Sequence, residues 1–179
     1  MELPSFRYHP DPVASGSVEA SDAECACCKQ SRGFIYTATV YSEDDDEPAV
    51  CPWCIADGSA HKKLKADFND SEGIEDGVPK PVMNEIMHRT PGFATWQSDS
   101  WLACCGDAMA FLKPVGIKEI RRDDYEWEGT LMTQIVQNIG ISGGAAVRLL
   151  ESLNKDRGPT AYAFRCLHCN RHRFFIDNP

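Results

Sequence analysis

The sequence predicts an α+β fold, in which an N-terminal zinc-ribbon-like hairpin module packs on a second α+β unit with a C-terminal cysteine knuckle and strand pair. Two C-x-x-C turns on either side of a strand-like segment predict the zinc ribbon. Helical spacing of apolar residues over 131–153, together with aromatic and β-branched runs, predicts the helices and strands. The predicted organisation is an extended arm (1–20), the zinc-ribbon module with its following helix (21–70) and the α+β unit (80–179).

The composition limits the classes of function. The chain has 179 residues, 42% hydrophobic and 25% charged, which is enough apolar material for a packed core. Its 27 acidic and 18 basic residues give a net charge of −9, which argues against nucleic acid as a partner because a protein that coats DNA or RNA needs a basic surface. No apolar run reaches the roughly 20 residues of a membrane-spanning helix, and the first residues do not resemble a signal peptide. We therefore expect a cytoplasmic protein without membrane contact.

Cysteine is the most informative residue type. Nine cysteines occur, which is an odd number, and a reducing compartment disfavours disulfides, so their spacing points to metal. Zinc takes four ligands at tetrahedral corners, and each C-x-x-C turn supplies two sulfurs from one side. We therefore predict one Zn²⁺ ion bound by Cys25, Cys28, Cys51 and Cys54. A set of buried free thiols is the alternative.

Two features of these turns leave alternatives open. Cys27 could replace Cys28 in a shorter C-x-C chelate, but Cys28 gives the usual knuckle spacing, and the role of Cys27 stays open. The Cys-Pro-Trp-Cys sequence from Cys51 to Cys54 also resembles the motif of thiol oxidoreductases, in which a helix N-terminus lowers the pKa of the first thiol. The missing βαβ pattern and the matching upstream turn favour zinc.

A second cysteine cluster is predicted in the C-terminal half. The turn formed by Cys166 and Cys169 follows a strand-like stretch, and its predicted partner is the adjacent pair Cys104 and Cys105. Adjacent cysteines bind one metal only through a strained local turn, so a second Zn²⁺ ion would use both, or one of them with a histidine. A reduced cluster that only packs is the alternative. The histidines in question are His168 and His172.

The elements of the N-terminal half follow from composition and punctuation. Residues 33–41 are aromatic and β-branched and predict a strand. We expect this strand to form a hairpin, across the acidic tip 43–47, with the run that leads into Cys51. Residues 54–68 indicate a modest helix, and the acidic, glycine-containing residues 69–80 indicate a linker.

The C-terminal half is predicted to be helical first and then extended. Residues 81–89 predict a helix that a Thr-Pro-Gly sequence stops. Apolar spacing over 131–153 predicts two helices or one broken helix, because Ser-Gly-Gly at 142–144 interrupts it. Strands are predicted at 161–166 and 173–176, on either side of the last C-x-x-C turn.

Three histidines outside the cysteine clusters have ordinary interpretations. His9 stands before Pro-Asp-Pro and is either a ligand or catalytic histidine, or part of a rigid arm that satisfies local backbone groups. His61 and His88 lie on predicted helical segments, where we expect them at the surface or partly packed.

Two acidic stretches form a candidate protein-binding surface. Acidic side chains can mimic the charge of nucleic acid and steer the protein to the basic cleft of a nuclease. Aromatic residues among the acids could anchor such an interface or belong to the core. Solvated loops are the alternative for both stretches. The candidate residues are Glu43, Asp44, Asp45, Asp46, Glu47, Asp123, Asp124, Tyr125, Glu126, Trp127 and Glu128.

Several motifs together carry a family resemblance. They are Phe-Arg-Tyr-His-Pro-Asp-Pro at 6–12 with Gly-Ser at 16–17, the run from Cys51 to Ala60, Trp101 to Phe111, and Phe164 to Cys169. With these motifs the chain resembles the CbrC family, also called UPF0167, whose members have been called colicin E2 tolerance proteins. The resemblance covers nearly the whole chain. It implies a bacterial cytoplasmic protein tied to survival of a bacteriocin, and colicin E2 is a DNase toxin.

The predicted function is therefore that of a zinc-binding, non-catalytic bacterial protein. It would confer tolerance or immunity to a nuclease toxin by binding the toxin and masking its DNA-binding surface. No nucleophile-elbow, phosphate-loop, zinc-protease or dinucleotide motif occurs, and four cysteines around zinc leave no open coordination position. The alternatives are a zinc-ribbon nucleic-acid-binding or regulatory adaptor, and a metal-dependent enzyme at the second cysteine cluster.

Overall fold

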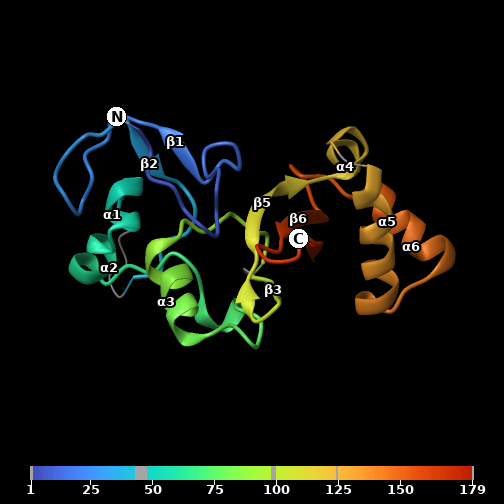
Figure 1. Ribbon diagram of the computed structural model, residues 1–179. Coiled ribbons are helices and arrows are strands. Elements are labelled where there is room, and N and C mark those ends of the chain that lie inside the picture. Colours follow the sequence, from blue (N-terminus) through green and yellow to red (C-terminus); the bar gives the residue numbers. More distant parts are fainter. Residues whose placement is uncertain (1, 43–47, 98–99, 124, 179) are drawn as a thin grey trace.

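The computed structural model describes residues 2–178 apart from 43–47, 98–99 and 124. Figure 1 shows small strands and helices near the N-terminus, a sheet in the middle, and the helical segments of residues 117–152 beyond it. The predicted α+β class, with one cysteine cluster near each end, is confirmed. Among the described residues, no helix combines the length and the apolar character needed to cross a membrane.

The regular elements are short and mixed in type. The strands are β1 (Val18–Ala20), β2 (Phe34–Tyr36), β3 (Ala103–Cys104), β4 (Asp107–Ala108), β5 (Ala110–Val115), β6 (Thr160–Arg165) and β7 (His172–Asp177). The helices are α1 (Pro52–Ala56), α2 (Ser59–Leu64), the 3-10 turn η1 (Ser71–Gly73), α3 (Lys80–Arg89), α4 (Ile117–Asp123), α5 (Tyr125–Gln134), the π-type η2 (Ile135–Ile139) and α6 (Gly143–Ser152).

The first C-x-x-C turn lies inside a two-stranded hairpin. β1 and β2 pair antiparallel, and the turn occupies their connection. The prediction that residues 33–41 would pair with the run into Cys51 is therefore wrong in its partner strand. The two residues before Cys51 bond to two different segments. The carbonyl of Ala49 accepts from the N–H of Ala26 at 2.8 Å, and the carbonyl of Val50 accepts from the N–H of Tyr36 at 2.9 Å. Bonds divided in this way do not make a regular ladder.

The helix predicted over 54–68 is two short helices, α1 and α2. Gly58 separates them with a φ of 73°, and Lys65 ends α2 with a φ of 53°. An α-helix needs a negative φ at every residue, so the helix cannot continue through Gly58. The predicted helix at 81–89 is confirmed as α3.

β5, β6 and β7 form an antiparallel sheet with β6 at its centre. The strands predicted at 161–166 and 173–176 are confirmed as β6 and β7. β5 and α4 are absent from the prediction. Lys113 and Pro114 break the apolar pattern of β5, and the sheet tolerates this proline because β5 is an edge strand.

Side chains of β6 alternate between two cores. Tyr162 and Phe164 enter an aromatic core that includes Trp101. Ala161 and Ala163 face the opposite core, which the helices α4 to α6 cover. The N-terminal elements surround a third core of their own. The sheet therefore separates an aromatic core from a helical one.

Residues 131–153 form two helical segments, as predicted. α5 and η2 end at Gly140, whose φ is 76°, and α6 begins after Ser142. Leu131 and Leu150 of the two segments are buried in the same core. The break lets α6 fold back beside α5, which Figure 1 shows at the edge of the molecule.

The arm at 1–20 is part of two cores. Phe6 and Val18 belong to the N-terminal core, whereas Tyr8 is fully buried in the aromatic core. The carbonyl of Tyr8 also accepts from the N–H of Phe111 in β5 at 2.8 Å. The arm therefore links the N-terminal unit to the sheet.

His9 is a buried structural residue of this arm. Its Nδ1 donates to the carbonyl of Pro91 at 2.8 Å, and its Nε2 accepts from the hydroxyl of Ser15 at 2.7 Å. Burial lowers the pKa of His9 to about 4, so the ring is neutral at pH 7. Of the two interpretations of His9, the structure favours the rigid arm.

Gly92 is predicted to be intolerant of a side chain. A Cβ there would lie 2.3 Å from the carbonyl oxygen of Phe68, so Gly92→Ala should destabilise the protein by about 1–3 kcal/mol. Gly129→Ala is the control, because nothing outside the local helix backbone lies within 4 Å of its Cβ position in α5, and alanine favours a helix. Urea unfolding of both variants tests this. Equal stability of the two would contradict it.

Candidate metal centres

The four N-terminal cysteines predicted as ligands come together. The sulfurs of Cys25, Cys28, Cys51 and Cys54 all lie within 4.8 Å of one another. All but the partly exposed Cys28 are buried. One pair comes from the β1–β2 connection and the other from the start of α1. The residues therefore fit a four-coordinate metal centre in number, type and spacing.

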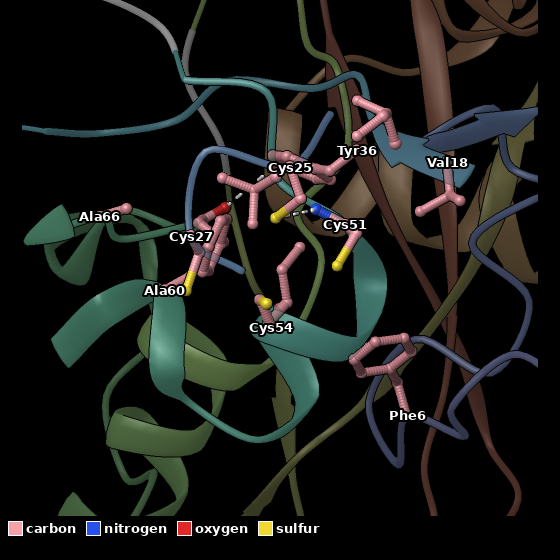
Figure 2. Packing of buried hydrophobic residues seen from close by; sticks show 13 residues of the cluster. Phe6, Val18, Cys25, Cys27, Tyr36, Cys51, Cys54, Ala60 and Ala66 are labelled. Carbon is pink, nitrogen blue, oxygen red and sulfur yellow. Dashed lines mark hydrogen bonds between the residues drawn. The ribbon is translucent and has the colours of Figure 1, made fainter. Parts of the chain in front are cut away.

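Backbone N–H groups favour the thiolate of Cys25. Burial raises the pKa of this thiol, but hydrogen bonds from the backbone of Cys28, Cys51 and Cys27 outweigh burial and lower the pKa to about 7. Figure 2 shows one of them, from the Cys51 N–H to the Cys25 sulfur at 3.3 Å. Since the thiolate is the form that binds metals, this sulfur is prepared for a cation.

The neighbouring sulfurs resist ionisation without a cation. Burial first, and then hydrogen bonding to the Cys25 sulfur, raise the pKa of Cys51 to about 11. Burial, opposed by a hydrogen bond with Ser59, also raises the pKa of Cys54. A second negative charge beside the first is unfavourable, and a bound metal cation would remove that penalty.

Cys27 lies outside the group of four. Its sulfur donates to the hydroxyl of Ser59 at 3.4 Å. Figure 2 shows this sulfur beside Ala60, to one side of the sulfurs of Cys25 and Cys54. The arrangement favours Cys28 as the ligand and assigns Cys27 to the packing against α2.

The four C-terminal cysteines also come together. The sulfurs of Cys104, Cys105, Cys166 and Cys169 all lie within 4.8 Å of one another. Both members of the adjacent pair take part, and the turn that allows this has positive φ at Cys105 (55°) and at the next residue (73°). The strain expected for adjacent ligands is therefore present in the backbone.

Two of the three C-x-x-C sequences, at Cys25 and at Cys166, have the same backbone structure. In each, the N–H of the first cysteine donates to the carbonyl five residues later, at 3.0 Å for Cys25 and 2.9 Å for Cys166. The residue four positions later donates back to the cysteine carbonyl, and this residue, Lys29 or Asn170, has a φ of 57° or 58°. The turn at Cys166 lowers the thiol pKa to about 6 through backbone N–H groups, which outweigh burial.

His168 serves the second cluster without joining it. Its Nε2 lies 2.9 Å from Asp107 Oδ2, and the other carboxylate oxygen accepts from the hydroxyl of Tyr8 at 2.9 Å. Arg7 also pairs with this carboxylate at 2.8 Å. The side chain of Asp107 is only 9% exposed. Asp107 therefore links the N-terminal arm to the turn between Cys166 and Cys169. Nothing in the sequence around Asp107 indicates this role.

Two acidic residues of the second stretch, Asp123 and Glu128, pair with neighbouring cations. Asp123 pairs with Lys113 and Arg122, and Glu128 with Arg121. The candidate residues 43–47 and 124, and the side chain of Tyr125, lie outside the described residues, and Glu126 is exposed.

Trp127 belongs to the core. Its side chain is 6% exposed and packs against Phe174 with ring centroids 5.5 Å apart. The prediction of Trp127 as an interface anchor is therefore wrong. The sequence misleads here because a helix with one buried face shows the same mixture of aromatic and acidic residues as a binding surface.

Comparisons with known proteins identify the family. The model of an uncharacterised protein family, UPF0167, matches residues 3–178. A UPF0167 protein from Mycobacterium bovis is 40% identical over 189 residues, which cover 98% of this chain and 94% of that protein. One from Pseudomonas aeruginosa is 40% identical over 177 residues, covering 98% and 97%. No solved structure matches the chain. The chain belongs to the UPF0167 family, as its motifs indicate.

Adjacent cysteines provide a matched test of the first centre. Cys28→Ser should lower the metal content by about one ion per chain, because a serine oxygen replaces one of the four sulfurs. Cys27→Ser should keep the full content, because that sulfur contacts Ser59 instead. Elemental analysis of the two purified variants decides between them. Loss of metal from Cys27→Ser alone would assign the ligand to Cys27.

Proposed function

We propose that this UPF0167 protein binds two zinc ions, one in each cysteine cluster, and that both ions are structural. The observation that carries the proposal is the repeated turn: two C-x-x-C knuckles of the same backbone structure, each beside two further sulfurs. Four thiolates in a small space suit zinc better than hard cations such as magnesium or calcium. Bound zinc would supply a tetrahedral crosslink and the positive charge that holds the sulfurs deprotonated.

A structural role follows from the ligand number. Four sulfurs fill the tetrahedral positions of zinc, so no position remains for water or substrate. The first centre would join the β1–β2 connection to α1, and the second would join the β3–β4 turn to the β6–β7 turn. In both, the metal would fix segments that lie far apart in the sequence. Closed coordination also argues against the alternative of a metal-dependent enzyme at the second cluster.

Zinc content and proton release test this proposal. The purified protein should contain two zinc ions per chain, whereas Cys51→Ser and Cys166→Ser should each contain one and melt at a lower temperature. Zinc binding to the first centre near pH 7 should release at least two protons, because the raised pKa values keep Cys51 and Cys54 protonated in the metal-free protein. Affinity should therefore fall as the pH falls. A Cys51→Ser variant that keeps both ions would exclude the first centre.

We further propose that the zinc-stabilised protein acts without catalysis, in the cytoplasm, by binding a protein, and that the partner class is a nuclease toxin. The family resemblance and the net charge of −9 support this choice. The same charge argues against the nucleic-acid adaptor. Since Asp123 and Glu128 are paired with cations, we place the toxin contact at Glu43–Glu47 rather than at 123–128.

Binding to a DNase domain at low and high salt tests the partner class. We expect binding that weakens as salt rises, because exposed charges are screened. Glu43→Gln with Asp44→Asn should weaken it, whereas Asp123→Asn with Glu128→Gln removes the same charge from paired residues and should change it little. No binding to any nuclease toxin would refute the toxin role and leave the zinc proposal intact.

A further inference from the structure

A third group of potential metal ligands lies outside both cysteine clusters. It consists of His61 on α2, Asp67 in the segment after α2, and His88 in the last turn of α3. One ligand atom from each lies within 4.8 Å of the others. The group combines two imidazoles and one carboxylate, and none of the three belongs to the proposed zinc centres.

The two rings converge on one oxygen. His61 Nδ1 lies 2.7 Å and His88 Nε2 lies 3.4 Å from the same atom, Asp67 Oδ1. The rings stack with centroids 3.6 Å apart and planes 17° from parallel. Two imidazolium cations would repel each other at this separation, so the stacked arrangement disfavours the state in which both rings are charged. Neutral imidazole is the form that binds metals, and it offers either ring nitrogen through a change of tautomer.

The backbone around the group holds two of its three residues, Asp67 and His88, in place. Asp67 exchanges two backbone hydrogen bonds of 2.8 Å with Tyr41, and the N–H of Phe68 donates to the carbonyl of Met87 at 2.8 Å. The buried Asn69 amide donates to two further carbonyls at the end of α3. The carboxylate and the second histidine are thus fixed relative to each other before any ligand arrives, which lowers the entropic cost of binding.

The group is also open to solvent. The side chains of His61, Asp67 and His88 are 35%, 29% and 22% exposed. An ion can therefore enter, and three protein ligands leave at least one coordination position for water or another molecule. The open coordination position distinguishes the group from the two four-sulfur clusters. Nitrogen and oxygen donors of this kind suit zinc, cobalt and nickel rather than calcium or magnesium.

We propose that His61, Asp67 and His88 form a third metal site, which binds a divalent transition-metal ion reversibly and keeps an open coordination position. The site is independent of the proposed zinc centres. Its ion should be the most easily exchanged of the three, because it has fewer protein ligands and no thiolate among them. The open position makes it the place in the described structure where a metal could meet a small molecule.

Cobalt titration of the zinc-loaded protein tests this site. We expect one Co²⁺ ion to bind per chain with the visible absorption of nitrogen and oxygen ligands, and without the thiolate-to-cobalt band that exchange into a cysteine cluster would produce. His88→Gln and Asp67→Asn should weaken Co²⁺ binding by about tenfold or more. His172→Gln is the control, since this histidine lies outside all three groups, and should bind as the unchanged protein does. Zinc content near two ions per chain shows that each variant is folded.

Chemical modification of the unchanged protein gives a second measurement that needs no variant. Co²⁺ should protect His61 and His88 from diethylpyrocarbonate, as read by peptide mass spectrometry, and should leave His172 equally reactive. The proposal is overturned if the zinc-loaded protein binds no further ion, if His88→Gln binds it equally well, or if no protection appears. Loss of zinc from the cysteine clusters would instead count against the zinc proposal, so the two failures are distinguishable.

Discussion

The grouping of thiols is the constraint on which this structure depends. Four sulfurs within 4.8 Å of one another cannot all be ionised unless a cation lies among them, and the backbone N–H groups at Cys25 and Cys166 favour only the first charge of each set. The apolar residues are divided among three cores, none of which spans the molecule. The first cysteine cluster lies in the N-terminal core, and the second cluster borders the aromatic core. Bound metal ions would therefore crosslink segments that a larger domain holds together by continuous apolar packing.

The arm and one carboxylate connect what the clusters hold separately. Tyr8 reaches the aromatic core, and its hydroxyl meets Asp107 beside the second cysteine turn. His168, which the spacing offered as a ligand, is instead a partner of the same carboxylate. This histidine, one of two alternative ligands in the sequence, thus supports the cluster from outside. Its neighbours on the turn supply the sulfurs.

Prediction from sequence succeeded where spacing determines geometry. A C-x-x-C pair fixes two sulfurs locally, so both cysteine quartets were predictable, although only the left-handed backbone at Cys105 decides that both adjacent cysteines take part. Contacts between separate elements were not predictable. The convergence of His61 and His88 depends on how α2 packs against α3, and β2 takes a partner from the arm that no local pattern indicates. The sequence left Trp127 open between an interface and the core, because a tryptophan among acidic residues fits both, and only the packing against Phe174 decides for the core.

The contacts of the N-terminal arm also determine the order in which parts of the structure can form during synthesis. The first cysteine cluster can assemble once residue 54 has left the ribosome, whereas the second must wait for Cys169. Tyr8 emerges before either cluster, yet its partner Asp107 is 99 positions away. Until residue 107 has been synthesised, Tyr8 therefore lacks the carboxylate that its hydroxyl contacts in the folded protein. Tyr8 stays outside its aromatic core until β6 has been synthesised, and exposed apolar surface of this kind makes a nascent chain prone to aggregation.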